Sequence, residues 1–164
     1  MRLYIVRHGK AERDSASGLD RDRALRPRGE RQARWLADQW AQALPGERPG
    51  LVLSSGYVRA METAKIIVGV LACPLIHARE LEIGHSAAAA AELVARRAGA
   101  SAGRTPLVLV GHNPQLEHLL ALLVTLPGGE APAMRTGEAA VLELPEGVGQ
   151  RAHLLGTLRV DDGD

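Results

Sequence analysis

Short runs of consecutive apolar residues alternate along the chain with longer segments in which apolar residues recur every three or four positions. The short runs indicate buried strands, and the spaced pattern indicates amphipathic helices. The patterns predict strands at 3–6, 51–53, 75–76, 107–110, 138–144 and 152–160. They predict helices at 27–44, 58–71, 87–98 and 114–123. This alternation predicts an α/β layer fold with a mostly parallel sheet.

Residues at the predicted helix starts agree with this assignment. Ser86 is a favourable N-cap for the alanine-rich helix that follows it. Asn113 and Pro114 supply an N-cap and a first-turn proline for the helix at 114–123. The polar segment 10–26 has the glycine, serine and aspartate content of a loop.

The length and cysteine content favour a single domain in a reducing compartment. A chain of 164 residues can bury one core, so we expect one domain spanning 1–164. The single Cys73 excludes an internal disulfide framework. The run Leu3–Val6 is far too short for a signal-peptide core, and no apolar run approaches the length of a membrane span. We therefore expect a cytoplasmic protein that does not bind membranes and acts as a monomer.

The charge balance gives no general reason to expect nucleic-acid binding. The formal net charge is only +1, although the chain carries 20 basic residues. All of them except Lys10 and Lys65 are arginines. Arginine presents a planar fork that matches phosphate and carboxylate. A compositional bias of the genome would give the same excess, so composition leaves both explanations open.

Polar residues follow three of the predicted strands at the point where each strand ends. Arg7 and His8 follow the first strand, Arg59 lies just beyond the second, and His112 follows the strand at 107–110. Ligands of parallel α/β sheets gather at the carboxyl ends of the strands. A single histidine after a strand is more often a hydrogen-bonded loop residue. Two histidines and two arginines at one sheet edge predict a site.

The chemistry of this set is that of a site for a phosphoryl group. Arg7 and Arg59 can each donate two hydrogen bonds to phosphoryl oxygens and retain their charge. Positive neighbours favour neutral imidazole, so His8 is suited to attack phosphorus and form a covalent phosphohistidine. A protonated His112 would stabilise an equatorial oxygen in the transition state. No metal or other cofactor is required, and Gly9 would leave room for the backbone beside the phosphoryl group.

Three segments resemble the motifs of the histidine phosphatase superfamily, in order. They are VRHGKAE, which carries Arg7 and His8, SSGYVRAMETA, which carries Arg59, and LVLVGHNPQLEHLL, which carries His112. The Gly-His-Asn-Pro form and the short length resemble the SixA-type branch of phosphohistidine phosphatases. DRALRPRGERQA and MRTGEAAVLEL are similar to two further stretches of that branch.

The resemblance implies a phosphoglycerate mutase-like fold, a three-layer α/β/α sandwich with a mixed, mostly parallel sheet. It implies that His8 is the nucleophile, His112 the second catalytic histidine, and Arg7 and Arg59 the phosphate ligands. Arg23 matches an arginine of the branch that would reach the phosphate or the partner surface. The chain departs from the usual pattern at Ala24, Arg26, Gln115 and Glu138, which bears on substrate preference rather than on chemistry.

The general acid is the least defined member of the predicted site. Mutase-like relatives supply it from a glutamate four residues before a glycine, and Glu80 has this spacing from Gly84. Glu82 is the second choice, and both residues would also fit as simple exposed charges. A substrate with a labile P–N bond needs a dedicated acid less.

Cys73 and Arg79 satisfy the Cys-x5-Arg spacing of cysteine-dependent phosphatases. That chemistry requires a glycine-rich loop that binds phosphate and lowers the pKa of the thiol. The five intervening residues contain no glycine. We therefore interpret Cys73 as a small packed residue. The other histidines show no spacing typical of metal ligands.

The leading hypothesis is a metal-independent phosphatase that removes phosphate from phosphohistidine on a signalling or phosphocarrier protein. The short segments between motifs leave little chain for a lid, which suits a side chain presented by a large partner. Two alternatives remain open: a small-molecule phosphomonoesterase or mutase-like enzyme of the same superfamily, and a phosphate-binding module without activity.

Overall fold

The computed structural model describes residues 1–100, 105–124, 130–146 and 150–161. Its strands form a six-stranded sheet in the order β3-β2-β4-β1-β5-β6. The strands are β1 (Arg2–Arg7), β2 (Leu51–Ser54), β3 (Leu75–His77), β4 (Leu107–Gly111), β5 (Ala139–Glu143) and β6 (His153–Leu158). The helices are α1 (Pro27–Ala41), α2 (Val58–Leu71), α3 (Ala87–Ala100) and α4 (Gln115–Leu123), with short 3-10 helices η1 (Asp20–Asp22) and η2 (Arg79–Leu81).

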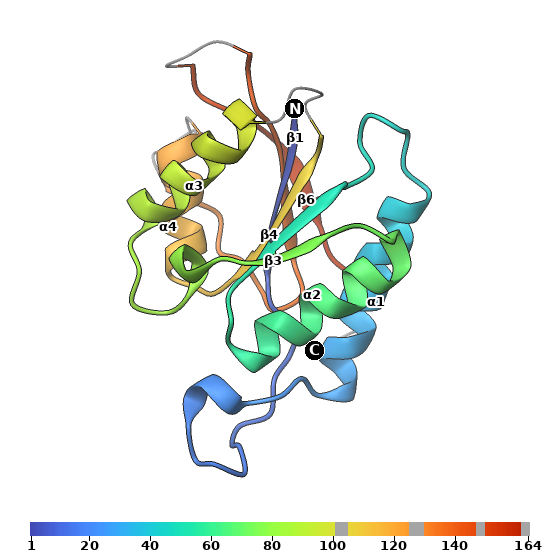
Figure 1. Ribbon diagram of the computed structural model, residues 1–164, viewed down its shortest axis with the longest axis vertical. Coiled ribbons are helices and arrows are strands. Elements are labelled where there is room, and N and C mark those ends of the chain that lie inside the picture. The colour runs from blue at the N-terminus through green and yellow to red at the C-terminus, as the bar shows by residue number, and fades with distance from the viewer. Residues whose placement is uncertain (101–104, 125–129, 147–149, 162–164) are drawn as a thin grey trace.

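The helices cover both faces of the sheet. In β1, Leu3 and Ile5 pack into a buried cluster that includes residues of α3 and α4. Tyr4 and Val6 point to the other face and pack into a cluster that includes residues of α1 and α2. Successive strand residues alternate between faces, so one apolar strand supplies both cores. Figure 1 shows the two helix pairs on opposite sides of the sheet, which makes three layers.

The sheet is mixed, as expected. β2, β4 and β1 are neighbours and run parallel, β3 is parallel to β2, and β5 pairs antiparallel with both β1 and β6. In the register of the central strands, Arg7 lies opposite Gly111 and Ser54 lies opposite Val110. The residues that follow these strands, His8, His112 and Ser55, are therefore brought to the same edge of the sheet.

The helices differ from the sequence expectation mainly at their ends. α1 ends at Ala41 rather than at residue 44, because i→i+3 hydrogen bonds tighten the chain directly after it. The hydroxyl of Ser86 accepts a hydrogen bond from the Ala89 N–H, as an N-cap does. No helix in the described ranges combines the length and apolar character needed to cross a membrane.

The prediction that Asn113 caps α4 is wrong. The helix begins at Gln115, and the residue before it, Pro114, makes no side-chain cap. The side-chain amide of Asn113 instead donates to Glu117 Oε1 at 2.8 Å and to the Met134 carbonyl at 2.9 Å. Asn113 therefore connects α4 to the segment before β5, an interaction that the local sequence does not reveal.

Candidate active site

The ends of β1 and β4 and the first turn of α2 border a cavity of about 240 Å³. Five of the six residues predicted for the site line it: Arg7, His8, Arg23, Arg59 and His112. Lys10, Ala11, Ile83, Asn113 and Thr136 complete the lining. The sixth predicted residue, Glu80, does not line this cavity.

His8 is buried and held in one orientation and one tautomer. Its side chain is only 7% exposed, and Nδ1–H donates to the Gly9 carbonyl at 2.8 Å. Its Nε2 then carries the lone pair and accepts from Arg59 Nε–H at 3.2 Å. Burial, together with the positive charges of Arg59, Arg7 and Arg23, lowers the pKa of His8 to about 4. His8 is thus a neutral imidazole whose nucleophilic nitrogen lies beside a guanidinium.

His112 lies against His8, with 5.1 Å between the ring centroids. Its Nε2 is 2.8 Å from Ser55 Oγ, and that oxygen also accepts from the Tyr57 N–H at 3.2 Å. Nδ1 has no hydrogen-bond partner among the described residues. The ring of Tyr57 packs edge-on against His112. Burial, followed by the charges of His8 and Arg59, lowers the pKa of His112 to about 3. Both histidines are therefore neutral in the folded protein at pH 7.

Arg59 is the central cation of the site. It lies in the first turn of α2 and is only 4% exposed. Besides its bond to His8, it donates from Nη1 to the Asp20 carbonyl at 2.8 Å and from Nη2 to Asp20 Oδ2 at 3.0 Å. Arg23 donates to the other oxygen of the same carboxylate at 2.8 Å and to the Glu12 carbonyl at 2.7 Å. Asp20 therefore links the two arginines.

Arg7 approaches the cavity from the end of β1. Its Nη1 donates to the Met134 carbonyl at 2.9 Å, and its Nε has no partner within the described part of the chain. Asn113 donates to the same carbonyl, so this short backbone segment fixes residues from two strand ends. Because the guanidinium still has free N–H groups, Arg7 can donate to a bound anion without losing its support.

The backbone after β1 is held by contacts to three other segments. The Gly9 N–H donates to Thr63 Oγ1 at 3.1 Å, and the Lys10 N–H donates to Gln32 Oε1 at 2.9 Å. The Gly137 N–H donates to the carbonyl groups of Arg7 and His8 at 3.1 and 3.0 Å. Gly137 has φ +70°, a conformation that favours glycine. These bonds fix the position of His8.

The expected reason for Gly9 is corrected by its surroundings. A Cβ on Gly9 would lie 2.6 Å from the Gly29 carbonyl oxygen, at the start of α1. The residue is small because two backbone segments approach closely there, whereas the expectation assigned the space to the phosphoryl group. The result for the site is similar, since this close approach fixes the loop that carries His8.

Neither candidate acid is placed to protonate a leaving group in this cavity. Glu80 accepts from Arg96 Nη2 at 2.7 Å and lines a separate cavity on the α3 side. Glu82 Oε1 is 2.7 Å from His77 Nε2. Partial burial would raise the pKa of Glu82, but the hydrogen bond and charge of His77 outweigh it, so the pKa lies below its usual value. Glu82 is therefore suited to be a charged partner of His77 and not a proton donor.

Cys73 shows no sign of an activated thiol. It is half-buried at the edge of the cluster under α1 and α2, and burial raises its pKa. An activated cysteine needs the opposite shift. In the described ranges, no group of three or more His, Cys, Asp or Glu side chains is arranged to hold a metal ion.

Sequence reasoning missed Asp20, Ser55 and Tyr57, which contact the predicted site residues. Ser55 and Tyr57 lie in the SSGYVRA segment, so their closeness to Arg59 along the chain was an available signal. Asp20 had no comparable signal. It lies in a loop of mixed charge, and only the tertiary structure brings it to Arg59.

Comparison with known proteins gives the family. The family model described as the histidine phosphatase superfamily, branch 1, matches residues 3–85. The chain belongs to this superfamily. The match includes Arg7, His8, Arg23 and Arg59 and ends before His112. Its members are phosphatases, so the sequence assigns the chain to a superfamily of phosphatases.

Solved structures extend the likeness to the whole chain. The protein histidine phosphatase SixA in complex with tungstate is 23% identical, with a TM-score of 0.82 over 97% of each chain. A protein assigned as phosphohistidine phosphatase SixA from Agrobacterium tumefaciens is 27% identical, with a TM-score of 0.78 over 96% of each chain.

The same fold is shared with a mycobacterial glucosyl-3-phosphoglycerate phosphatase. That structure is 20% identical, with a TM-score of 0.73 over 94% of this chain and 97% of the other. No curated protein matches the chain significantly. The fold is therefore that of the superfamily, and structures with it include phosphatases named for protein and for small-molecule substrates.

Proposed function

We propose that this chain is a metal-independent phosphatase that carries the phosphoryl group on His8, with phosphohistidine of a partner protein as its substrate. The observation that carries the proposal is the state of His8. Its Nδ1–H is fixed on the Gly9 carbonyl, so Nε2 presents its lone pair beside the Arg59 guanidinium. A neutral imidazole in this position is suited to attack phosphorus.

The reaction then has two displacements. In the first, His8 Nε2 forms a bond to phosphorus while the bond from phosphorus to the leaving imidazole nitrogen breaks. The electron pair goes to that nitrogen, and the ring leaves as neutral imidazole because its other nitrogen carries a proton. In the second, water attacks phosphorus and the bond to Nε2 breaks. Orthophosphate is released, the proton lost by water passes to solvent, and His8 returns to its neutral form.

The charges around His8 fit the demands of both steps. The phosphoryl group brings close to two negative charges. Arg7, Arg59 and Arg23 line the cavity, and Arg7 and Arg59 have further N–H groups beyond those bonded to described residues. His112 Nδ1 has no partner in the described part of the chain. It can donate to a phosphoryl oxygen when the Ser55 hydroxyl donates to Nε2, because the neutral ring then carries its proton on Nδ1. The three arginines supply the neutralisation for which other phosphatases use a metal ion, and His112 supplies a hydrogen bond.

Two observations favour phosphohistidine over a phosphoester. No carboxylate is among the residues that line the cavity, and Glu80 is bound to Arg96. A phosphoester requires a proton on its leaving oxygen, whereas the labile P–N bond depends less on an acid. Two of the similar structures carry the name of a phosphohistidine phosphatase.

One feature favours a small-molecule phosphatase as the second candidate. A cavity of about 360 Å³ adjoins the first one and shares Ile83, His112 and Asn113 with it. It has room for the remainder of a small phosphoester, and the fold occurs in a glucosyl-3-phosphoglycerate phosphatase. A phosphate-binding module without activity would need the arginines, but not a histidine in the nucleophile's tautomer.

The test compares wild type with His8→Ala on a phosphohistidine protein, an acyl phosphate and a set of sugar phosphates. We expect the phosphohistidine protein to be the best substrate of wild type and His8→Ala to be inactive on all of them. A labelled phosphodonor and a quench that avoids acid should trap label on wild type only. Equal activity of the two proteins on every substrate would contradict the mechanism, and a preference for sugar phosphates would favour the second candidate.

A further inference from the structure

The carboxylate of Asp20 lies on the arginines of the candidate site. Oδ2 accepts from Arg59 Nη2 at 3.0 Å, and Oδ1 accepts from Arg23 Nη1 at 2.8 Å. Each oxygen thus has its own guanidinium. A phosphoryl group would present the same kind of acceptor to the same two donors. Asp20 is therefore an anion supplied by the chain itself.

We propose that Asp20 competes with the phosphoryl group for Arg59 and Arg23 and so weakens the binding of inorganic phosphate, the product. This inference rests on the proposed function, which assigns those arginines to phosphate. It adds a residue that controls how tightly the site holds a free phosphate ion. The same competition promotes release of orthophosphate at the end of the reaction.

The burial of Arg59 explains why a carboxylate lies beside it. Arg59 is almost fully buried and lies beside Arg23, Arg7 and two neutral histidines. A buried cation without an anionic partner is costly. The Asp20 carboxylate provides that partner while no substrate is bound, and the pKa of Asp20 is lowered by Arg23 and by Arg59 as expected for this pairing.

The Asp20 carboxylate is also free to move away from the two arginines. Its side chain is 55% exposed, whereas that of Arg59 is 5% exposed. The 3-10 helix η1 that carries it has no buried residue. The backbone carbonyl of Asp20 holds Arg59 Nη1 independently. A rotation of the carboxylate into solvent therefore frees Arg59 Nη2 and Arg23 Nη1 without removing the backbone support of Arg59.

The decisive variant is Asp20→Asn, and Asp22→Asn is its matched control. Asp22 lies on the same 3-10 helix and accepts from Ser17 Oγ at 2.7 Å, whereas the carboxylate that pairs with Arg59 and Arg23 is that of Asp20. Each variant removes one negative charge from η1, so a general change in net charge affects both. Asp20→Asn keeps the shape of the side chain and removes its charge.

The experiment is calorimetric titration of the full chain with inorganic phosphate at pH 7.5. We expect Asp20→Asn to bind phosphate about tenfold more tightly than wild type, the size of one like charge removed beside a partly exposed anion site. Inorganic phosphate should also become a stronger inhibitor of turnover by a similar factor. Asp22→Asn should bind as wild type does.

Arg59→Met separates the failure of this inference from failure of the proposed function. If Arg59→Met binds phosphate as wild type does, Arg59 is not a phosphate ligand and the proposed function is wrong at that residue. If Arg59→Met loses binding while Asp20→Asn binds equally or more weakly, the competition is refuted, and Asp20 instead supports the arginines. An equal gain in Asp22→Asn would reduce the effect to net charge and would also refute the inference.

Discussion

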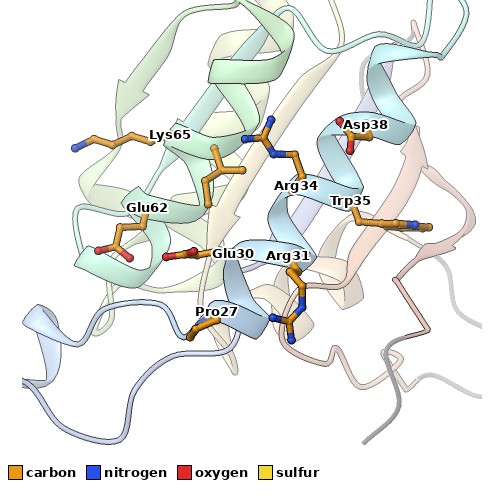
Figure 2. A pocket seen from close by; sticks show the side chains of 9 residues that line it. Pro27, Glu30, Arg31, Arg34, Trp35, Asp38, Glu62 and Lys65 are labelled. Carbon is orange, nitrogen blue, oxygen red and sulfur yellow. The ribbon is translucent and has the colours of Figure 1, made fainter.

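The two cavities that contrast most in this protein are the one beside His8 and a larger one on the helices α1 and α2. The second has a volume of about 740 Å³ against about 240 Å³ for the first. Its lining includes Glu30, Arg31, Arg34, Asp38, Glu62 and Lys65. Figure 2 shows these side chains extending from two neighbouring helices, with Glu30 reaching from α1 toward Glu62 on α2.

The cavities differ in size, but the difference that matters for chemistry is the environment of their charged groups. In the α1–α2 groove, Arg34, Asp38 and Lys65 are exposed and remain hydrated. In the site, His8, His112 and Arg59 are buried, and hydrogen bonds fix the orientation of each. Burial changes the protonation of these groups and strengthens their interactions. The smaller cavity is therefore the one in which chemistry is expected.

Arg59→Met should produce the largest loss of activity among the variants that test this contrast. Methionine keeps the length and packing of the side chain but removes the cation beside His8 Nε2. We expect kcat/KM for phosphohistidine protein to fall by at least about a hundredfold. Steady-state kinetics measures the loss, and thermal unfolding checks the fold. A decrease in kcat/KM of less than about threefold would show that Arg59 does not take part in the reaction.

Ser55→Ala should produce a smaller loss, about tenfold in kcat/KM, the scale of a residue that orients a catalytic side chain. Ser55 Oγ is the hydrogen-bond partner of His112 Nε2, so its removal leaves the ring without a fixed orientation. Ser54→Ala is the matched control, because Ser54 is equally buried and donates only to the Ser55 carbonyl. Equal losses of activity in both variants would indicate a packing effect instead of an orienting role.

Protonation of the site histidines is a third measure of the contrast. The pKa values of about 4 for His8 and about 3 for His112 keep both rings neutral in the folded protein at pH 5. Nitrogen NMR of the rings should show no protonation of either between pH 7 and pH 5, with the proton of His8 on Nδ1. Charged rings at pH 6 would contradict the burial argument.

The same pKa values give the sign of an effect on stability. Unfolding exposes both rings and returns their pKa to about 6.5, so below that pH the unfolded chain binds protons that the folded chain does not. The free energy of unfolding is therefore highest above about pH 6.5 and decreases as the pH falls toward 4. Urea unfolding of wild type and His8→Gln at pH 7 and pH 5 measures it, and the variant should lose less.

The smallest effect is expected in the α1–α2 groove. The double variant Arg34→Ala and Lys65→Ala removes two exposed cations without touching a residue of the site. We expect kcat/KM to stay within about twofold of wild type, because exposed charges contribute little. A loss comparable to that of Arg59→Met would show that the groove takes part in binding the protein substrate.

Sequence patterns alone predicted the helices and strands, and they named most of the residues that line the candidate site. Continuous apolar runs such as Leu107–Val110 predict central strands because both faces of such a strand are buried. Parallel strands bring their carboxyl ends to one edge, so the positions of Arg7, His8, Arg59 and His112 along the chain already predicted that they meet. Local chemistry was sufficient wherever a residue's place follows from the strand or helix that carries it.

Hydrogen bonds between residues far apart in the sequence could be seen only in the tertiary structure. Glu80 pairs with Arg96 and does not line the cavity. Asn113 donates to the Met134 carbonyl and does not cap a helix. Asp20 accepts a hydrogen bond from Arg59. Loop residues have no periodic pattern to fix their direction, and their partners are chosen by the packing of the whole chain. Arg59 could therefore be identified from its motif, whereas its pairing with the Asp20 carboxylate could not.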